Sequence, residues 1–128
     1  MSGDLFSILL VDDDPAVRAV TEASLRVLGG FEVTPAPGGA QAIELCRGSR
    51  FDLVLIDVMM PLLDGPATIR AMKTENLLDT TPFVFLTAKV HPEAQDALLS
   101  LGATRVIAKP FEPEALVEQI RSVIEHSR

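Results

Sequence analysis

Short apolar runs alternate with amphipathic stretches along the whole chain, and each kind of segment predicts its own element. The short runs have strand character, so we expect strands over residues 6–11, 31–34, 53–56, 83–86 and 106–108. The stretches between them carry apolar residues at helical spacing and predict helices over 15–28, 39–47, 66–73, 92–101 and 112–126. Strict alternation of strands and helices is typical of a parallel sheet covered on both faces. The pattern therefore predicts an α/β fold.

The prolines predict where the strands lie within this sheet. Proline cannot donate to a strand ladder, so it occurs at sheet edges or at strand starts. Pro35 and Pro37 therefore place the second strand at an edge, whereas Pro82 is acceptable at the start of the fourth. The central positions suit the continuously apolar runs, which are 8–11, 53–56 and 83–86. The strand order 2-1-3-4-5 meets these constraints, and it is the flavodoxin-like, doubly wound (βα)5 arrangement.

One domain accounts for the whole length. The chain has 128 residues, which is too few for two ordinary cores. Apolar residues make up 48% of it, enough for one compact core and too many for a disordered chain. We expect a single domain over residues 1–128, with its core at about 6–126 and no effector domain.

The charge balance narrows the range of partners. The formal net charge is −7 at pH 7, whereas nucleic-acid-binding modules and proteins that adhere to anionic membranes need basic surfaces. We therefore expect no nucleic-acid partner and no membrane partner. The single cysteine, Cys46, cannot form an internal disulfide, and no apolar run resembles a signal peptide or a membrane span. These features predict a cytoplasmic protein.

Polar residues follow the central strands at the points where each strand ends. Asp12 and Asp13 follow the first predicted strand, Asp57 the third, Thr87 the fourth and Lys109 the fifth. Ligands of open parallel sheets bind beyond the carboxyl ends of the strands, where the strand order reverses. We therefore expect these five side chains to converge at one edge of the sheet.

Three converging carboxylates need a compensating positive charge. Two unit charges 4 Å apart repel by about 4 kcal/mol at an effective dielectric of 20. Mg²⁺, or Mn²⁺ in its place, suits such oxygen ligands, and Lys109 supplies a fixed positive charge. An aspartate beside a divalent cation, an ammonium and a threonine hydroxyl is typical of a phosphoryl-transfer site, in which the carboxylate can act as the nucleophile.

Four ordered motifs resemble those of the receiver domains of two-component response regulators: "ILLVDDDP", "DLVLIDVMMPLLDG", "FLTA" and "VIAKPF". The resemblance spans essentially the whole chain. It implies that Asp57 accepts a phosphoryl group from a sensor histidine kinase or a phosphotransfer protein. It also implies that the domain assists its own phosphorylation and dephosphorylation without being an enzyme in the usual sense, and that phosphorylation switches contacts with a downstream protein.

The resemblance also implies a metal-ligand set. Asp13 and Asp57 would bind Mg²⁺ directly, with the backbone carbonyl of Met59 as a third protein ligand, and Asp12 would act through a metal-bound water. Met59 and Lys89 occupy the two positions that flank the phosphoryl group in this family and modulate its hydrolysis. A bulky apolar Met59 could hinder an in-line water, which predicts slow loss of phosphate.

The same resemblance assigns the phosphoryl oxygens to Thr87 and Lys109, and implies a cis peptide bond between Lys109 and Pro110. Receivers often carry Tyr or Phe three positions before this lysine, where the present chain has Val106. Signalling in those receivers couples the threonine to burial of the aromatic ring. We therefore expect Thr87 and Val106 to switch in an altered form, which reshapes the surface of the last two helices and the last strand weakly or differently. A homodimer would use the same surface.

Ordinary structural roles account for the other candidate residues. Asp14 precedes Pro15 and suits the N-cap of the first helix. The pair Asp64–Gly65 predicts a turn, and Cys46 on the inner side of a helix suits the core. His91 and His126 have no partner at metal-ligand spacing, so we expect both at the surface.

Three other functions fit the sequence less well. A pseudo-receiver would dock or dimerise without taking phosphate, and the intact acidic set with Lys109 argues against it. A haloacid-dehalogenase-type phosphohydrolase also forms an aspartyl phosphate, but it needs a second Asp two residues after the nucleophile, where this chain has Met59. Neither a P-loop nor a G-x-G-x-x-G motif follows the first strand, which argues against a nucleotide-binding protein.

Overall fold

The structure is a computed structural model that describes residues 5–88 and 91–127. The strands are β1 (Ser7–Val11), β2 (Glu32–Ala36), β3 (Leu53–Asp57), β4 (Phe83–Thr87) and β5 (Arg105–Ala108). The helices are α1 (Pro15–Ala23), which continues into the π-helical turn η1 (Ser24–Leu28), α2 (Gly39–Gly48), α3 (Gly65–Thr74), α4 (Pro92–Ser100) and α5 (Pro113–His126). The predicted elements are confirmed, with ends that differ by one or two residues.

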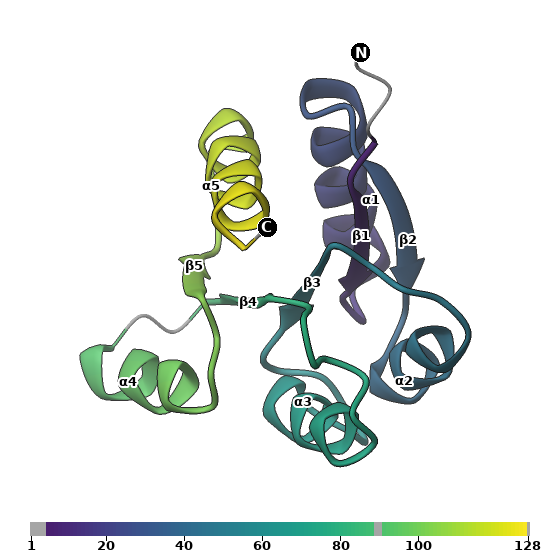
Figure 1. Ribbon diagram of the computed structural model, residues 1–128. Coiled ribbons are helices and arrows are strands. Elements are labelled where there is room, and N and C mark those ends of the chain that lie inside the picture. Colours follow the sequence, from purple (N-terminus) through teal and green to yellow (C-terminus); the bar gives the residue numbers. More distant parts are fainter. Residues whose placement is uncertain (1–4, 89–90, 128) are drawn as a thin grey trace.

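All strands of the sheet are parallel, in the order β2-β1-β3-β4-β5 (Figure 1). This is the predicted flavodoxin-like order. β2 lies at an edge, as its prolines predict, and Pro35 is paired with Leu10 of β1. β1 and β3 are neighbours although α2 and β2 separate them in the sequence, so the order reverses between them. Their carboxyl ends therefore meet at the switch point of the sheet.

Two apolar layers cover the sheet because successive side chains of a strand point to opposite faces. In β1, Ile8 and Leu10 pack in one layer, and Leu9 and Val11 in the other. The first layer contains residues of η1 and α5, and the second contains residues of α2, α3 and α4. The apolar residues of α5 recur at helical spacing, and all five on its inner side are buried: Leu116, Val117, Ile120, Val123 and Ile124.

The face that α1 and η1 turn toward the sheet differs from the apolar periodicity. Leu25 is fully buried, but Val20 is 59% exposed and Leu28 is 51% exposed. Thr21 and Ser24 are buried instead. Their hydroxyls donate to backbone carbonyl oxygens one helical turn earlier, at 2.8 and 2.9 Å, so polar side chains are buried there with their hydrogen bonds made. An apolar stripe of this helix is left at the surface as a result.

No helix within the described ranges is both long enough and apolar enough to cross a bilayer.

Candidate functional site

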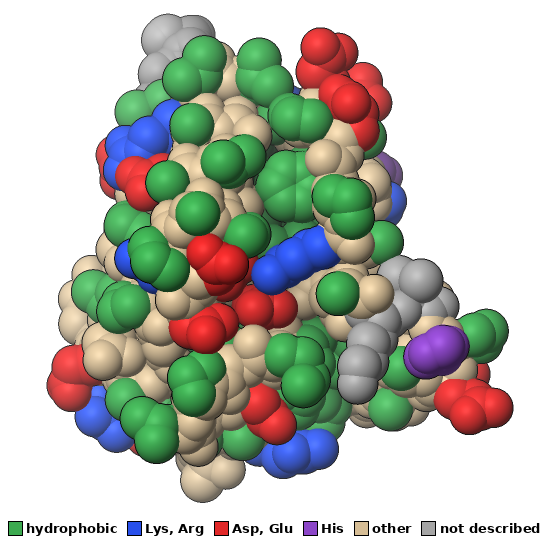
Figure 2. All heavy atoms as spheres, turned by 180° about the vertical axis from the view of Figure 1, so that it is seen from behind, with side chains coloured by type: hydrophobic (Ala, Val, Ile, Leu, Met, Phe, Trp, Pro, Cys, Tyr) green, Lys and Arg blue, Asp and Glu red, His purple; other side chains and the backbone are tan. Residues whose placement is uncertain are grey.

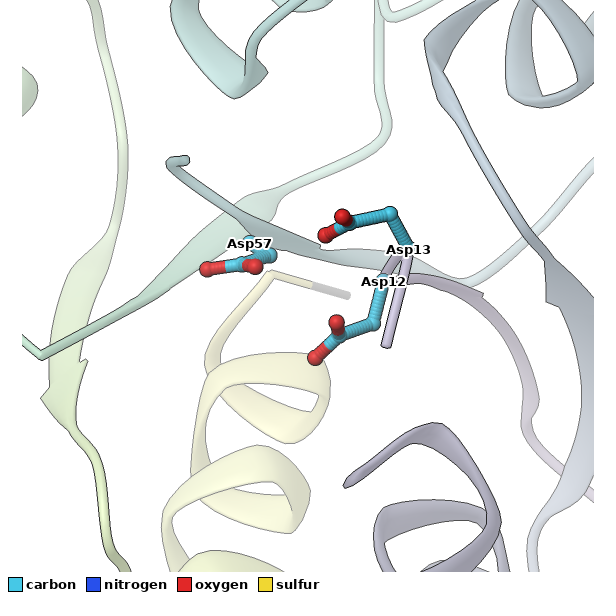
Figure 3. A group of neighbouring side chains, drawn as sticks. All are labelled: Asp12, Asp13 and Asp57. Atoms are coloured by element: carbon cyan, nitrogen blue, oxygen red, sulfur yellow. The ribbon is translucent and has the colours of Figure 1, made fainter. Parts of the chain in front are cut away.

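Three carboxylates converge at the switch point of the sheet. Asp12 and Asp13 follow β1, and Asp57 ends β3, the neighbouring strand. One carboxylate oxygen from each lies within 4.8 Å of the others, and the side chains face a common space (Figure 3). Asp12 and Asp57 are buried, and Asp13 is half-buried. The predicted convergence of these aspartates is confirmed.

Lys109 brings a positive charge to the same cluster from the loop after β5. Its Nζ lies 3.0 Å from Asp12 Oδ2 and 3.2 Å from Asp57 Oδ1. Its backbone N–H donates to the carbonyl oxygen of Thr87 at 2.9 Å, so the ends of β4 and β5 are tied together. Thr87 is buried at the end of β4. The peptide bond to Pro110 is cis, as predicted.

The loop between β1 and α1 is held by its own aspartates. The backbone N–H of Asp14 donates to Asp12 Oδ1 at 3.0 Å. Asp14 Oδ1 in turn accepts hydrogen bonds from the backbone N–H groups of Ala16 and Val17 at the start of α1. Asp14 is therefore the helix N-cap, as predicted, and the acidic pair is fixed directly against the end of a helix.

The segment Asp64–Gly65 does more than form the predicted turn. Asp64 is the N-cap of α3, because its Oδ1 accepts from the backbone N–H of Ala67 at 2.8 Å. Gly65 donates its N–H to the carbonyl oxygen of Val58 at 2.9 Å. A Cβ at Gly65 would lie 2.4 Å from the carbonyl oxygen of Asp57, so only glycine lets α3 start this close to the acidic cluster. Sequence patterns gave these residues no part in the site because the contact joins two backbones.

Burial and charge act in opposite directions on the ionisable groups of the cluster. Burial raises the pKa of Asp57 above its ordinary value; Lys109 opposes this increase, and the charges of Asp12 and Asp13 add to it. Burial by itself would lower the pKa of Lys109, but its hydrogen bond to Asp12 and the negative charges of Asp57 and Asp12 raise it overall. The ammonium therefore stays charged, while an excess of negative charge remains to attract a cation.

An apolar groove lies directly beside the cluster. It has a volume of about 500 Å³ and runs between α1 and the start of α5. Its walls include Val17 and Val20 on one side and Phe111 on the other, and Lys109 lines it as well. Figure 2 shows this face, with apolar side chains gathered next to acidic and basic ones. An exposed apolar surface next to a charged site is typical of a contact surface for another protein.

The remaining predicted site residues lie near the cluster or outside the described part. Met59 follows Asp57 by two positions, and its side chain is 61% exposed. Val106 of β5 is paired with Phe85 of β4 and is half-buried. Lys89 lies outside the described residues.

The cysteine and the histidines lie apart from the cluster. Burial raises the pKa of the Cys46 thiol to about 11, which makes it an inert, partly buried group. His91 and His126 are both exposed, as predicted.

The comparisons with known proteins agree with this geometry. The family model of the response regulator receiver domain matches residues 8–121. The transcriptional regulatory protein CseB of Streptomyces coelicolor is 37% identical over 123 residues, which cover 94% of this chain and 50% of that protein. The chain therefore spans about half the length of the curated relatives it matches.

Solved structures share the whole fold. A putative response regulator from Chloroflexus aurantiacus superposes with a TM-score of 0.88 at 32% identity, covering 95% of this chain and 99% of that one. The receiver domain of the sensor histidine kinase PA1611 from Pseudomonas aeruginosa, described with a magnesium ion coordinated in its active site cleft, has a TM-score of 0.81 at 30% identity, covering 96% and 97%. The chain belongs to the response regulator receiver domains of two-component systems.

Proposed function

We propose that this receiver domain is a phosphoacceptor, in which Asp57 takes a phosphoryl group from a phosphohistidine of a sensor histidine kinase or a phosphotransfer protein. The observation that carries the proposal is the convergence of three carboxylates within 4.8 Å, with Lys109 against two of them. A structural ion pair would need one carboxylate for one ammonium, so the excess of acid needs another explanation.

The donor set fits a divalent metal ion. Carboxylate oxygens are hard ligands of the kind Mg²⁺ and Mn²⁺ prefer. Asp13 and Asp57 would hold the ion together with the carbonyl of Met59, and Asp12 would hold it through water. The bound ion would supply positive charge to the oxygens of the transferred group.

The residues of this chain would perform the transfer as follows. A carboxylate oxygen of Asp57 forms the new bond to phosphorus while the phosphorus–nitrogen bond of the donor breaks, and the bonding electron pair stays with the imidazole. Lys109 and Thr87 hold the phosphoryl oxygens, so they neutralise and orient the group as it moves. Lys109 also favours the ionised form of Asp57, which is the form that attacks.

The test is incubation with acetyl phosphate and Mg²⁺, followed by intact-mass measurement. We expect the protein to gain one phosphoryl group that is stable in acid and labile in base, as an acyl phosphate is. A protein that gains no mass under these conditions would be a pseudo-receiver, and the proposal would be wrong.

The apolar groove between α1 and α5 supports a protein as the phosphoryl donor. Lys109 belongs to both the groove and the acidic cluster, so a protein seated in the groove would place its phosphohistidine against Asp57. We propose that an apolar helix face next to this histidine occupies the groove.

Val20→Glu is expected to slow phosphorylation by a protein donor about fivefold or more, the effect of losing a contact worth over about 1 kcal/mol. Val20 is 59% exposed and lines the groove, so the variant should fold normally and react with acetyl phosphate at the wild-type rate. Val27→Glu is the matched control, because Val27 is 80% exposed and lies outside the groove lining. Equal rates for both variants with the protein donor would place the donor elsewhere.

A further inference from the structure

We propose that Arg18 is a positioning residue of the acidic cluster: its guanidinium holds the backbone of Asp12 so that the carboxylate of Asp13 stays in place to bind a divalent cation. The inference rests on the proposed metal-dependent function. Arg18 is half-buried in α1, four residues after the N-cap Asp14.

The contact is direct and follows from helix geometry. Arg18 Nη1 donates to the backbone carbonyl oxygen of Asp12 at 2.7 Å. Side chains of an α-helix tilt toward its N-terminus, so a long side chain in the second turn can reach back to the chain that enters the helix. The backbone N–H of Arg18 also donates to the carbonyl oxygen of Asp14, as the first regular bond of the helix.

Asp13 depends on this support more than its neighbours do. Asp12 is held on both sides, since its carboxylate accepts from Asp14 N–H and from Lys109. Asp14 is held by its capping bonds to α1. Within residues 5–88 and 91–127, no hydrogen bond or ion pair is formed by the Asp13 carboxylate. Its position is therefore set by the backbone between Asp12 and Asp14, and Arg18 fixes one end of that segment.

A positioning role of Arg18 and a purely electrostatic role predict opposite effects on cation binding when its guanidinium is removed. Arg18 makes no ion pair with any described carboxylate, so none of them neutralises its charge directly. If Arg18 acted only through its charge, a neutral replacement would make the cluster more negative and would tighten cation binding. If Arg18 acts by holding the Asp12 carbonyl, the same replacement weakens binding, because a ligand that loses its orientation binds a metal more weakly.

Arg18→Met keeps the length of the side chain and removes its donors and charge. We expect its affinity for Mg²⁺, measured by titration calorimetry, to fall about tenfold relative to wild type. In the metal-free protein, hydrogen exchange at the Asp14 amide should become faster, because Arg18 no longer fixes the Asp12 backbone that carries the acceptor of this amide. Arg18→Lys keeps a charged donor and should recover part of the affinity.

Arg121→Met is the matched control. Arg121 Nη2 donates to the carbonyl oxygen of Gly29 at 2.7 Å, an equal bond at the other end of the α1–η1 segment. This variant should lose stability and keep the wild-type Mg²⁺ affinity. The inference is wrong if Arg18→Met binds Mg²⁺ as tightly as wild type or more tightly, or if Arg121→Met weakens binding equally. A wild-type protein that binds no Mg²⁺ would instead overturn the proposed function.

Discussion

Asp57→Asn is expected to gain no phosphoryl group from acetyl phosphate and Mg²⁺ under conditions that phosphorylate the wild type fully. The amide nitrogen and oxygen of asparagine occupy nearly the same volume, but neither is a nucleophile comparable to a carboxylate oxygen. The loss should be complete at the level that intact-mass measurement detects. The fold should persist, because burial and the charges of Asp12 and Asp13 already disfavour the ionised carboxylate of Asp57 in the wild type.

Asp64→Asn is the matched control for this experiment. Asp64 lies in the same loop after β3, but it caps α3 and does not belong to the acidic cluster. The control should be phosphorylated like the wild type. Phosphorylation of Asp57→Asn at the wild-type level would move the acceptor to another residue, and peptide mapping of the modified site would identify it.

Lys109→Met is expected to lower the free energy of unfolding of the metal-free protein by about 3 kcal/mol near neutral pH, the cost of leaving a buried charge without its partner. Lys109 contacts both Asp12 and Asp57, and all three side chains are largely buried. The variant should also be phosphorylated far more slowly, since it lacks the ammonium that would hold the phosphoryl oxygens. Denaturant unfolding with and without Mg²⁺ measures the stability.

The pH dependence gives this variant a distinct signature. Lys109 lowers the pKa of Asp57, so its removal raises that pKa further above the value in the unfolded chain. A carboxyl whose pKa is raised by folding binds protons more readily when folded, and stability rises as the pH falls. The stability deficit of Lys109→Met should therefore shrink as the pH is lowered from neutral, and Mg²⁺ should recover part of it at neutral pH. A stability deficit that changes with neither pH nor Mg²⁺ would show that Lys109 acts through packing.

The sheet could be predicted from the sequence because its determinants are local. Runs such as 53–56 and 83–86 are apolar at every position, which suits only strands buried on both faces. Pro35 predicts an edge position for its strand whatever residues the neighbouring strands contain. The acidic cluster followed from the same reasoning, because parallel strands deliver their last residues to one edge.

The supporting contacts could not be predicted in this way. Arg18 and Gly65 act on backbone carbonyl oxygens of Asp12 and Asp57, and no pattern of side-chain polarity records such a partner. The exposed apolar face of α1 could not be predicted either, for a related reason. Thr21 can be buried because its hydroxyl is satisfied within its own helix, so a polar residue replaced an apolar one on the inner face.

The two edge strands of the sheet, β2 and β5, affect how copies of this domain behave at high local concentration. β2 carries Pro35, which offers no N–H to an incoming strand, and β5 is only four residues long and begins with the charged Arg105. Free edges of this kind are poor templates for strand addition. Copies of this domain brought to high local concentration should therefore resist amyloid-like stacking.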